Sequence, residues 1–294
     1  MSDRTHLIER AAARLPGATD PVMTSRALPE PTAPVSSLPP RVRPALPQLR
    51  RQVALNVSRL AQTGIVMPWT SSARVAEEFR IIKRNIMASW QPNTVQATQP
   101  PRVIMVTSAR PREGKTFTSI NLALAFAAEP KSVTVLIDAD MVRSDTAKTL
   151  EVPLAPGLTD VLTREVSLSD ALIQTDLANL VVLPPGSYGP HIPELLAGDA
   201  PQLMVSEIID RYPNHVIIMD TPPCLASTDP TALAAIATQI VFVVEATHTQ
   251  KEEVEAALNL VSACANISLV LNQAPAGTSD HFGSYSYYYQ PAKT

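Results

Sequence analysis

Residues 103–116 read Val-Ile-Met-Val-Thr-Ser-Ala-Arg-Pro-Arg-Glu-Gly-Lys-Thr, and this stretch decides the fold of the chain. Its apolar start, Val103–Thr107, predicts a short buried strand, and the Ala/Leu-rich segment that follows, Thr116–Ala128, predicts a helix. The turn between them ends in Gly-Lys-Thr at 114–116. Strand, loop and helix in this order indicate a phosphate-binding loop of the Walker A type.

Such a loop holds phosphates through its backbone N–H groups and the start of the helix. Lys115 would reach the β- and γ-phosphate oxygens, and the Thr116 hydroxyl would bind Mg²⁺. Ala109 and Arg112 stand where this motif commonly has glycine, and Arg112 would be strained if its φ were positive. Nucleotide contacts are expected from Pro111, Arg112, Glu113, Gly114, Lys115, Thr116 and Phe117.

Carboxylates follow two other predicted strands. Val133–Ile137 ends in Asp138-Ala139-Asp140, so the two aspartates point to the same side because strand side chains alternate. One aspartate can organise Mg²⁺ while the other accepts the proton of an attacking hydroxyl, and the sequence does not say which is the base. The strand around Val216–Met219 ends in Asp220, which matches the Walker B pattern. We therefore expect catalytic roles for Lys115, Asp138, Asp140 and Asp220, and metal contacts from Thr116, Asp138 and Asp220.

Further apolar runs continue the alternation of strands and helices. Strands are predicted at Leu180–Leu183, Ile240–Val244 and Ile267–Leu271, and helices at Pro201–Arg211, Asp229–Ala237 and Lys251–Cys264. Strands that are apolar throughout predict a parallel sheet covered on both faces. The expected fold is an open, doubly wound, mostly parallel α/β sheet of the P-loop NTPase class, with its ligand at the carboxyl ends of the strands. Asn272, just after the last strand, is a candidate for reading the nucleotide base, and an ordinary turn asparagine is nearly as plausible.

Composition divides the chain into four parts. Residues 1–15 predict a short amphipathic helix, and residues 16–68 predict a disordered linker because prolines recur through its first half. Residues 69–272 form the predicted nucleotide domain, in which residues 69–100 contain a helix over Ser71–Ser89 with a serine N-cap. Residues 273–294 form a flexible tail.

The bulk numbers narrow the function classes. A formal net charge of −3 gives no sign of a nucleic-acid partner. The two cysteines build neither a zinc spacing nor a disulfide framework, which favours a reducing compartment. No run reaches the ~20 apolar residues of a membrane span, so we expect a cytoplasmic protein that reaches a membrane only through a partner.

Four of the six tyrosines stand close to the end of the chain. They are Tyr285, Tyr287, Tyr288 and Tyr289, in a segment rich in Gly and Ser that cannot build a core. Accessible phenols of this kind are best interpreted as phosphorylation substrates, and each phosphate would add about −1.5 to −2 charge. A buried aromatic strand or an aggregation-prone end are the alternatives.

These features together resemble the bacterial tyrosine kinases of the exopolysaccharide type, and most closely the exosortase-associated tyrosine autokinases. The matching segments are ARPREGKT at 109–116, LIDADMVR at 136–143, IIMDTPP at 217–223 and YSYYY at 285–289. EEFRIIK at 77–83 is similar to the E-x-x-R-x-x-R oligomerisation segment of that family, with Glu77, Arg80 and Lys83 in its three places. Arg112 and Val142 depart from the family pattern.

The resemblance implies an ATP- and Mg²⁺-dependent autokinase in which the tail of one subunit is phosphorylated by its neighbour within a homo-oligomer. It also implies activation by the cytoplasmic tail of a membrane chain-length determinant, or polysaccharide co-polymerase, that recruits the kinase to the inner membrane. Control of polysaccharide chain length or export is the expected biological role.

Two other functions fit the same residues. A switch ATPase like MinD or ParA shares this fold, but here Arg110 occupies the place of the signature lysine of that class. Such ATPases also lack a tyrosine-rich tail. A nucleotide-dependent scaffold of the export machinery that has lost kinase activity is kept open by Arg112. Phosphotyrosine on the purified protein distinguishes the kinase from both.

Overall fold

The computed structural model describes residues 49–67, 69, 74–90, 101–187, 189 and 191–275. These residues belong to one compact unit that begins at Pro47. The predicted N-terminal helix, most of the predicted linker, the N-cap serines and the tyrosine cluster lie outside the described residues. Among the helices of the described part, none is long and apolar enough to cross a bilayer.

The core of the unit is one eight-stranded sheet with the order β1-β4-β5-β3-β6-β2-β7-β8. Every neighbouring pair is parallel except β4 and β5, which are antiparallel. The strands are β1 (Arg51–Val53), β2 (Val103–Ser108), β3 (Val133–Asp138), β4 (Ile173–Thr175), β5 (Leu180–Leu183), β6 (His215–Asp220), β7 (Gln239–Glu245) and β8 (Ile267–Asn272). The predicted mostly parallel sheet is confirmed.

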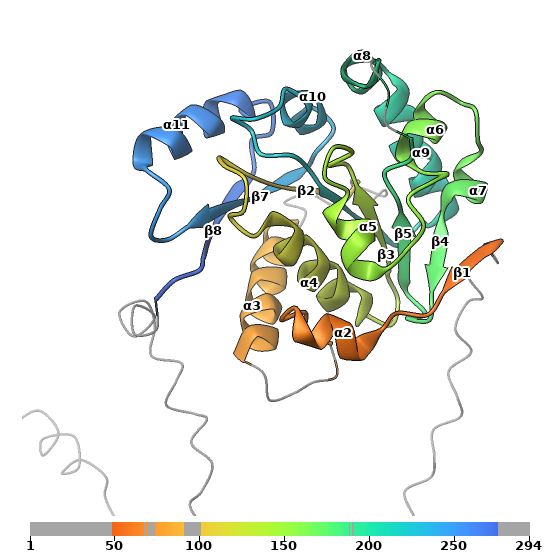
Figure 1. Cartoon of the computed structure of the whole chain (residues 1–294), viewed down its shortest axis with the longest axis horizontal. Coiled ribbons are helices and arrows are strands. Elements are labelled where there is room, and N and C mark those ends of the chain that lie inside the picture. Colours follow the sequence, from red (N-terminus) through yellow and green to blue (C-terminus); the bar gives the residue numbers. More distant parts are fainter. Residues whose placement is uncertain are drawn as a thin grey trace, which may run out of the picture. The chain divides into compact units, whose positions relative to one another are not determined.

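Helices cover both faces of this sheet because the chain winds in two directions. From β2 the chain passes through α4 to β3 on one side, whereas α10 and α11 lead through β7 to β8 on the other. Right-handed crossovers in opposite directions place their helices on opposite faces, and Figure 1 shows α2, α3 and α4 apart from α10 and α11. The helices are α2 (Val57–Gln62), α3 (Arg74–Ser89), α4 (Lys115–Ala127), α5 (Asp145–Leu150), α6 (Leu158–Leu162), α7 (Leu168–Ala171), α8 (Ile192–Ala197), α9 (Ala200–Arg211), α10 (Asp229–Ala234) and α11 (Lys251–Leu260).

The folded domain begins earlier than the sequence predicts. The predicted linker ran to residue 68, but β1 pairs with β4, and α2 packs its buried Leu60 into the core. Leu49, Leu55, Ile65 and Met67 are also buried. The linker boundary is therefore wrong, because residues 49–67 supply apolar side chains that bury against elements far along the chain.

The last strand is less buried than expected. β8 was predicted as a strand covered on both faces, but Leu269 and Leu271 are 60% and 61% exposed. β8 pairs only with β7 and so forms the edge of the sheet in the described part of the chain.

Candidate active site

The phosphate loop lies at the carboxyl end of β2, and the next two strands on one side of it, β6 and β3, also end in functional residues. β3 and β6 pair so that Asp138 lies directly opposite Asp220. β6 in turn pairs with β2, which places Val106 opposite Asp220. The Walker A loop, the Asp138/Asp140 pair and Asp220 therefore meet at the carboxyl ends of three neighbouring strands, as the sequence predicts.

Asp220 is fully buried and is held by three hydroxyl groups. Its Oδ2 accepts hydrogen bonds from Thr116 and Thr146, both at 2.7 Å, and its Oδ1 accepts one from Ser119 at 3.0 Å. Burial raises the pKa of Asp220, and these three hydrogen bonds lower it. Sequence reasoning missed Ser119 and Thr146; Ser119 could have been found because it lies one helical turn beyond Thr116.

The two aspartates after β3 have different surroundings. Both carboxylate oxygens of Asp138 accept backbone hydrogen bonds, from Asp140 N at 3.3 Å and Ala147 N at 2.9 Å. Burial, and then the charge of Asp220, raise the pKa of Asp138 well above its usual value. Asp140 keeps 6% exposure and accepts one hydrogen bond, from Arg143 N to Oδ1 at 3.2 Å. Burial raises the pKa of Asp140 as well, while Lys115 acts to lower it.

Lys115 is a buried cation with no carboxylate partner within ion-pairing distance among the described residues. Burial lowers its pKa, and the charges of Asp220, Asp140 and Glu113 act to raise it. A lysine that feels several carboxylates without pairing with one of them remains available to an anionic ligand. This is the arrangement expected for the phosphate-binding lysine.

The oxygen donors fit a hard divalent cation. Mg²⁺ typically takes one or two protein carboxylates with phosphate and water oxygens, rather than a cage of protein ligands. Thr116, Asp138 and Asp220 supply such oxygens. Asp138 and Asp220 lie opposite each other on paired strands, and burial together with the charge of Asp220 raises the pKa of Asp138. In the described part of the chain no cluster of three or more His, Cys, Asp or Glu side chains is placed to hold a metal ion.

Other predicted contact residues have different environments. Pro111 and Arg112 are exposed on the loop. Phe117 packs edge to face on Phe79 of α3 with ring centroids 5.9 Å apart, so its ring contacts a helix. The Glu113 carboxylate is buried and accepts hydrogen bonds from Arg110 N at 2.5 Å, from Glu245 N at 3.4 Å and from the Thr249 hydroxyl. Its side chain is thus committed to the loop itself.

Asn272 lies on the phosphate loop. Its Nδ2 donates to the Glu113 carbonyl at 2.9 Å, and Gly114 lies so close that a Cβ there would be 2.0 Å from this nitrogen. The amide that was expected to read the base therefore binds loop backbone.

The predicted oligomerisation residues divide into two groups. Arg80 and Glu77 form a partly exposed pair at 2.6 Å, and Arg84 lies 3.6 Å from the same carboxylate. Lys83 is turned inward: its ammonium donates to Glu129 at 2.6 Å and to the Ala125 carbonyl at 3.1 Å, and its side chain is 12% exposed. Lys83 therefore fastens α3 to the end of α4.

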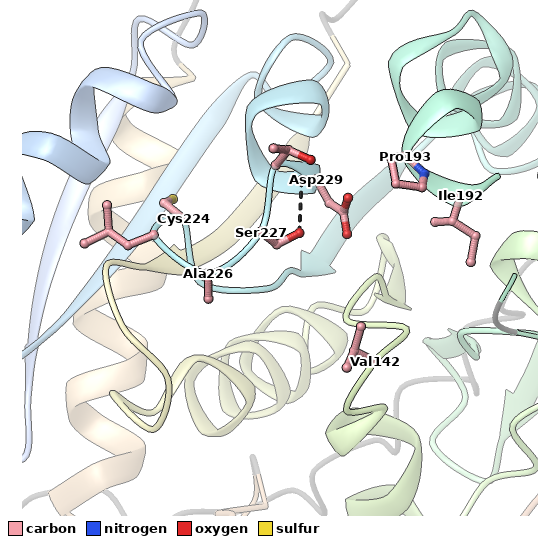
Figure 2. Close-up of a pocket in the computed structure, with 9 residues that line it drawn as sticks. Val142, Ile192, Pro193, Cys224, Ala226, Ser227 and Asp229 are labelled. Carbon is pink, nitrogen blue, oxygen red and sulfur yellow. Dashed lines mark hydrogen bonds between the residues drawn. The ribbon is translucent and has the colours of Figure 1, made fainter. Parts of the chain in front are cut away.

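A cavity of about 530 Å³ opens beside the phosphate loop. Val142 from the segment after β3, Ile192 and Pro193 from α8, and the segment Cys224–Asp229 line it (Figure 2). Cys224 N and Leu225 N donate to the carbonyls of Ser108 and Ala109, so the cavity wall is tied to the start of the loop. Val142 and Cys224 of this lining belong to the segments that directly follow β3 and β6, the strands that end in Asp138 and Asp220.

Comparison with known proteins now decides the family. Residues 101–272 match the family model described as an AAA domain. The chain is 30% identical over 217 residues to the putative tyrosine-protein kinase CapB of Staphylococcus aureus, covering 73% of this chain and 90% of CapB. The chain belongs to the bacterial tyrosine-protein kinase family. The enzyme class expected from the sequence is thereby confirmed.

Solved structures agree with this membership. The crystal structure of the chimerical protein CapA2B2 superposes with a TM-score of 0.61 at 27% identity, covering 76% of this chain and 93% of that one. The MinC:MinD cell division complex of Aquifex aeolicus superposes with a TM-score of 0.51 at 21% identity, covering 62% and 72%, which supports the shared P-loop fold alone. The predicted fold class is confirmed.

Proposed function

We propose that this bacterial tyrosine kinase transfers the γ-phosphoryl group of ATP to the tyrosines of its own C-terminal segment, in trans between subunits of a homo-oligomer. The observation that carries the proposal is that Lys115 lies close enough to Asp140 and Asp220 for both charges to raise its pKa, at the carboxyl ends of neighbouring strands. The second support is the cluster Tyr285, Tyr287, Tyr288 and Tyr289 at the end of the chain.

Asp140 is the better candidate for the base. Both oxygens of Asp138 accept backbone hydrogen bonds, whereas the Oδ2 of Asp140 accepts none from the described residues. In the proposed step the phenol oxygen bonds to the γ-phosphorus while the bond from that phosphorus to the bridging oxygen of ADP breaks. The phenol proton moves to Asp140, and Lys115 stabilises the charge on the transferring group.

Bound Mg²⁺ would be held by Thr116 and Asp220, with Asp138 beside them, and would neutralise charge on the β- and γ-phosphates. The three hydroxyl donors of Asp220 favour its ionised form and orient the carboxylate in its buried position.

The cavity of about 530 Å³ is the proposed entrance for the acceptor tyrosine. It offers apolar surface at Val142, which is 71% exposed, and at Leu225, which is 45% exposed. Burying the faces of a tyrosine ring on such side chains is favourable, and its hydroxyl can still make hydrogen bonds.

We further propose that subunits meet through Glu77 and Arg80 on α3, and that the kinase is recruited to the inner membrane by the cytoplasmic tail of a polysaccharide chain-length determinant. Control of capsular or exopolysaccharide length and export would follow from cycles of tail phosphorylation. The partly exposed Glu77–Arg80 pair is supporting evidence, because its groups are available to a neighbour.

The experiment is intact-mass analysis after incubation with Mg·ATP. Wild type should gain several phosphoryl masses, and a variant with Phe at 285, 287, 288 and 289 should gain none. Lys115→Met should abolish the gain without unfolding the protein, while the exposed Lys131→Met serves as a matched control that keeps it.

ATP hydrolysis without any gain in mass would replace the kinase reading by a switch ATPase. Undiminished phosphorylation in Lys115→Met would remove Lys115 from the mechanism.

A further inference from the structure

The phosphate loop contains a non-glycine residue in the left-handed region. Arg112 has a φ of 71°, and Gly114, two residues later, has a φ of 95°. This conformation has a steric cost for an L-residue, because its Cβ crowds the following carbonyl. Glycine is free of that cost, so some other contact must hold the loop at Arg112.

The end of β8 provides that contact. Gln273, which also has a positive φ of 54°, donates from Nε2 to the Arg112 carbonyl at 2.9 Å. Its neighbour Asn272 donates to the next carbonyl, that of Glu113, at the same distance. Two consecutive side-chain amides therefore hold two consecutive loop carbonyls across a sequence separation of 161 and 159 residues.

Holding these carbonyls also orients the N–H groups. In a trans peptide the C=O and N–H point in opposite directions, so the N–H groups of Glu113 and Gly114 point away from β8. No described residue accepts a hydrogen bond from either of them. Successive free N–H groups around left-handed residues form an anion-binding concavity.

We propose that Gln273 is a positioning residue of the nucleotide site that compensates for the missing glycine at position 112. Its amide holds the Arg112 peptide in the orientation that presents the Glu113 N–H to a phosphate. Gln273 would act on the nucleotide only through the Arg112 peptide, and the inference rests on the nucleotide site of the proposed function. It also brings the residue that directly follows β8 into contact with the phosphate loop.

The test is a double-mutant cycle read by nucleotide affinity. Binding of the fluorescent nucleotide mant-ADP with Mg²⁺ is measured for wild type, Gln273→Ala, Arg112→Gly and the double variant. Losing one hydrogen bond that orients the loop should weaken binding about 3- to 10-fold when residue 112 is Arg. The same change should cost less than about 2-fold when residue 112 is Gly, since glycine needs no clamp.

Two further variants sharpen the result. Gln273→Glu keeps the size of the side chain but cannot donate, so it should weaken binding at least as much as Gln273→Ala. Gln202→Ala, an exposed glutamine on α9, should leave affinity unchanged. Thermal melts of each variant separate lost affinity from lost fold.

An equal loss in both backgrounds, or no loss in either, would overturn the role of Gln273 while leaving the nucleotide site intact. Wild type that fails to bind mant-ADP would overturn the site itself and the inference with it.

Discussion

At the scale of the residue, buried polar groups show how the sequence holds a charged site inside a sheet. Asp220 is 0% exposed, and a buried carboxylate without partners would lose several kcal/mol of solvation. Three hydroxyls from α4 and α5 offset that loss. Thr116 donates its hydroxyl hydrogen to Asp220, and the same hydroxyl keeps lone pairs that could bind the proposed metal ion.

His215 yields a prediction for the pH dependence of stability. It is buried at the start of β6, its Nδ1 lies 2.8 Å from the Tyr212 carbonyl, and burial lowers its pKa. Its imidazole is therefore more readily protonated in the unfolded chain, so stability falls as pH drops from the unfolded pKa toward the lower folded pKa. Arg102, packed beside it, also lowers the pKa.

The Tm of wild type should fall between pH 7.5 and pH 5. In His215→Asn we expect this fall to be smaller by a few degrees, roughly the effect of 1 kcal/mol on a domain of this size. Scanning calorimetry at both pH values measures the change. His191→Asn, an exposed control, should melt with wild-type pH dependence. A pH dependence in His215→Asn equal to that of wild type would contradict the assignment.

At the scale of the element, α3 combines a docking face with an outward face. Ala76, Phe79 and Ile86 are buried, and Phe79 contacts Phe117, which directly follows Thr116. Lys83 completes the docking face through Glu129 and the Ala125 carbonyl. Glu77, Arg80 and Arg84 lie on the outward face.

Lys83→Ala should therefore destabilise the subunit by about 1–2 kcal/mol, because a largely buried, charge-assisted hydrogen bond is lost and a carbonyl loses its donor. Arg84→Ala, whose side chain is 69% exposed, should change stability by less than about 0.5 kcal/mol. Urea unfolding of both variants makes the comparison. Equal midpoints would show that Lys83 does not dock α3.

Glu77→Arg, in contrast to Lys83→Ala, should change the assembly of subunits and not the stability of a single subunit. Its charges are exposed pairs worth less than about 1 kcal/mol within a subunit, so the midpoint of urea unfolding should hardly move. If α3 joins subunits, reversing this charge should shift the protein to smaller species in light scattering coupled to size exclusion. An unchanged mass distribution would place the subunit contact elsewhere.

At the scale of the whole molecule, residues 49–67 act as a strap around the sheet. Arg51 in β1 donates to the carbonyls of Pro156 and Ala171, and Leu55 N donates to Asp176. At its other end, Val66 N donates to Asn121 of α4 at 2.9 Å. The strap therefore links the β1 edge of the sheet to the helix that carries Lys115 and Thr116.

Removing residues 1–46 should leave Tm within a few degrees of wild type, because the compact unit begins after them. Removing residues 1–67 should give an unstable or aggregating protein. The strap buries Leu49, Leu55, Leu60, Ile65 and Met67, and each large apolar side chain contributes about 1.5–3 kcal/mol, which in sum is comparable to the whole stability of a typical domain. Thermal melts of the two truncations test this, and equal Tm values would refute the role of the strap.

Local patterns were sufficient for much of the fold and part of the site. β2, β3, β5, β6 and β7 arise from continuous apolar runs that can be recognised locally, and Gly114, Lys115 and Thr116 are consecutive in the sequence. Asp138 and Asp220 follow strands directly. These strands and site residues can be predicted from the sequence because the residues that share a role are neighbours in it.

The sequence by itself determined the parallel sheet, the phosphate loop and the carboxylates at its strand ends, since strand period and strand direction place them without further information. The tertiary structure alone decided that residues 49–67 belong to the fold, that Lys83 turns inward, and that Asn272 and Gln273 hold the loop. Those contacts join residues between 42 and 161 positions apart, and hydrogen bonding between distant segments leaves no trace in the local sequence pattern of either one.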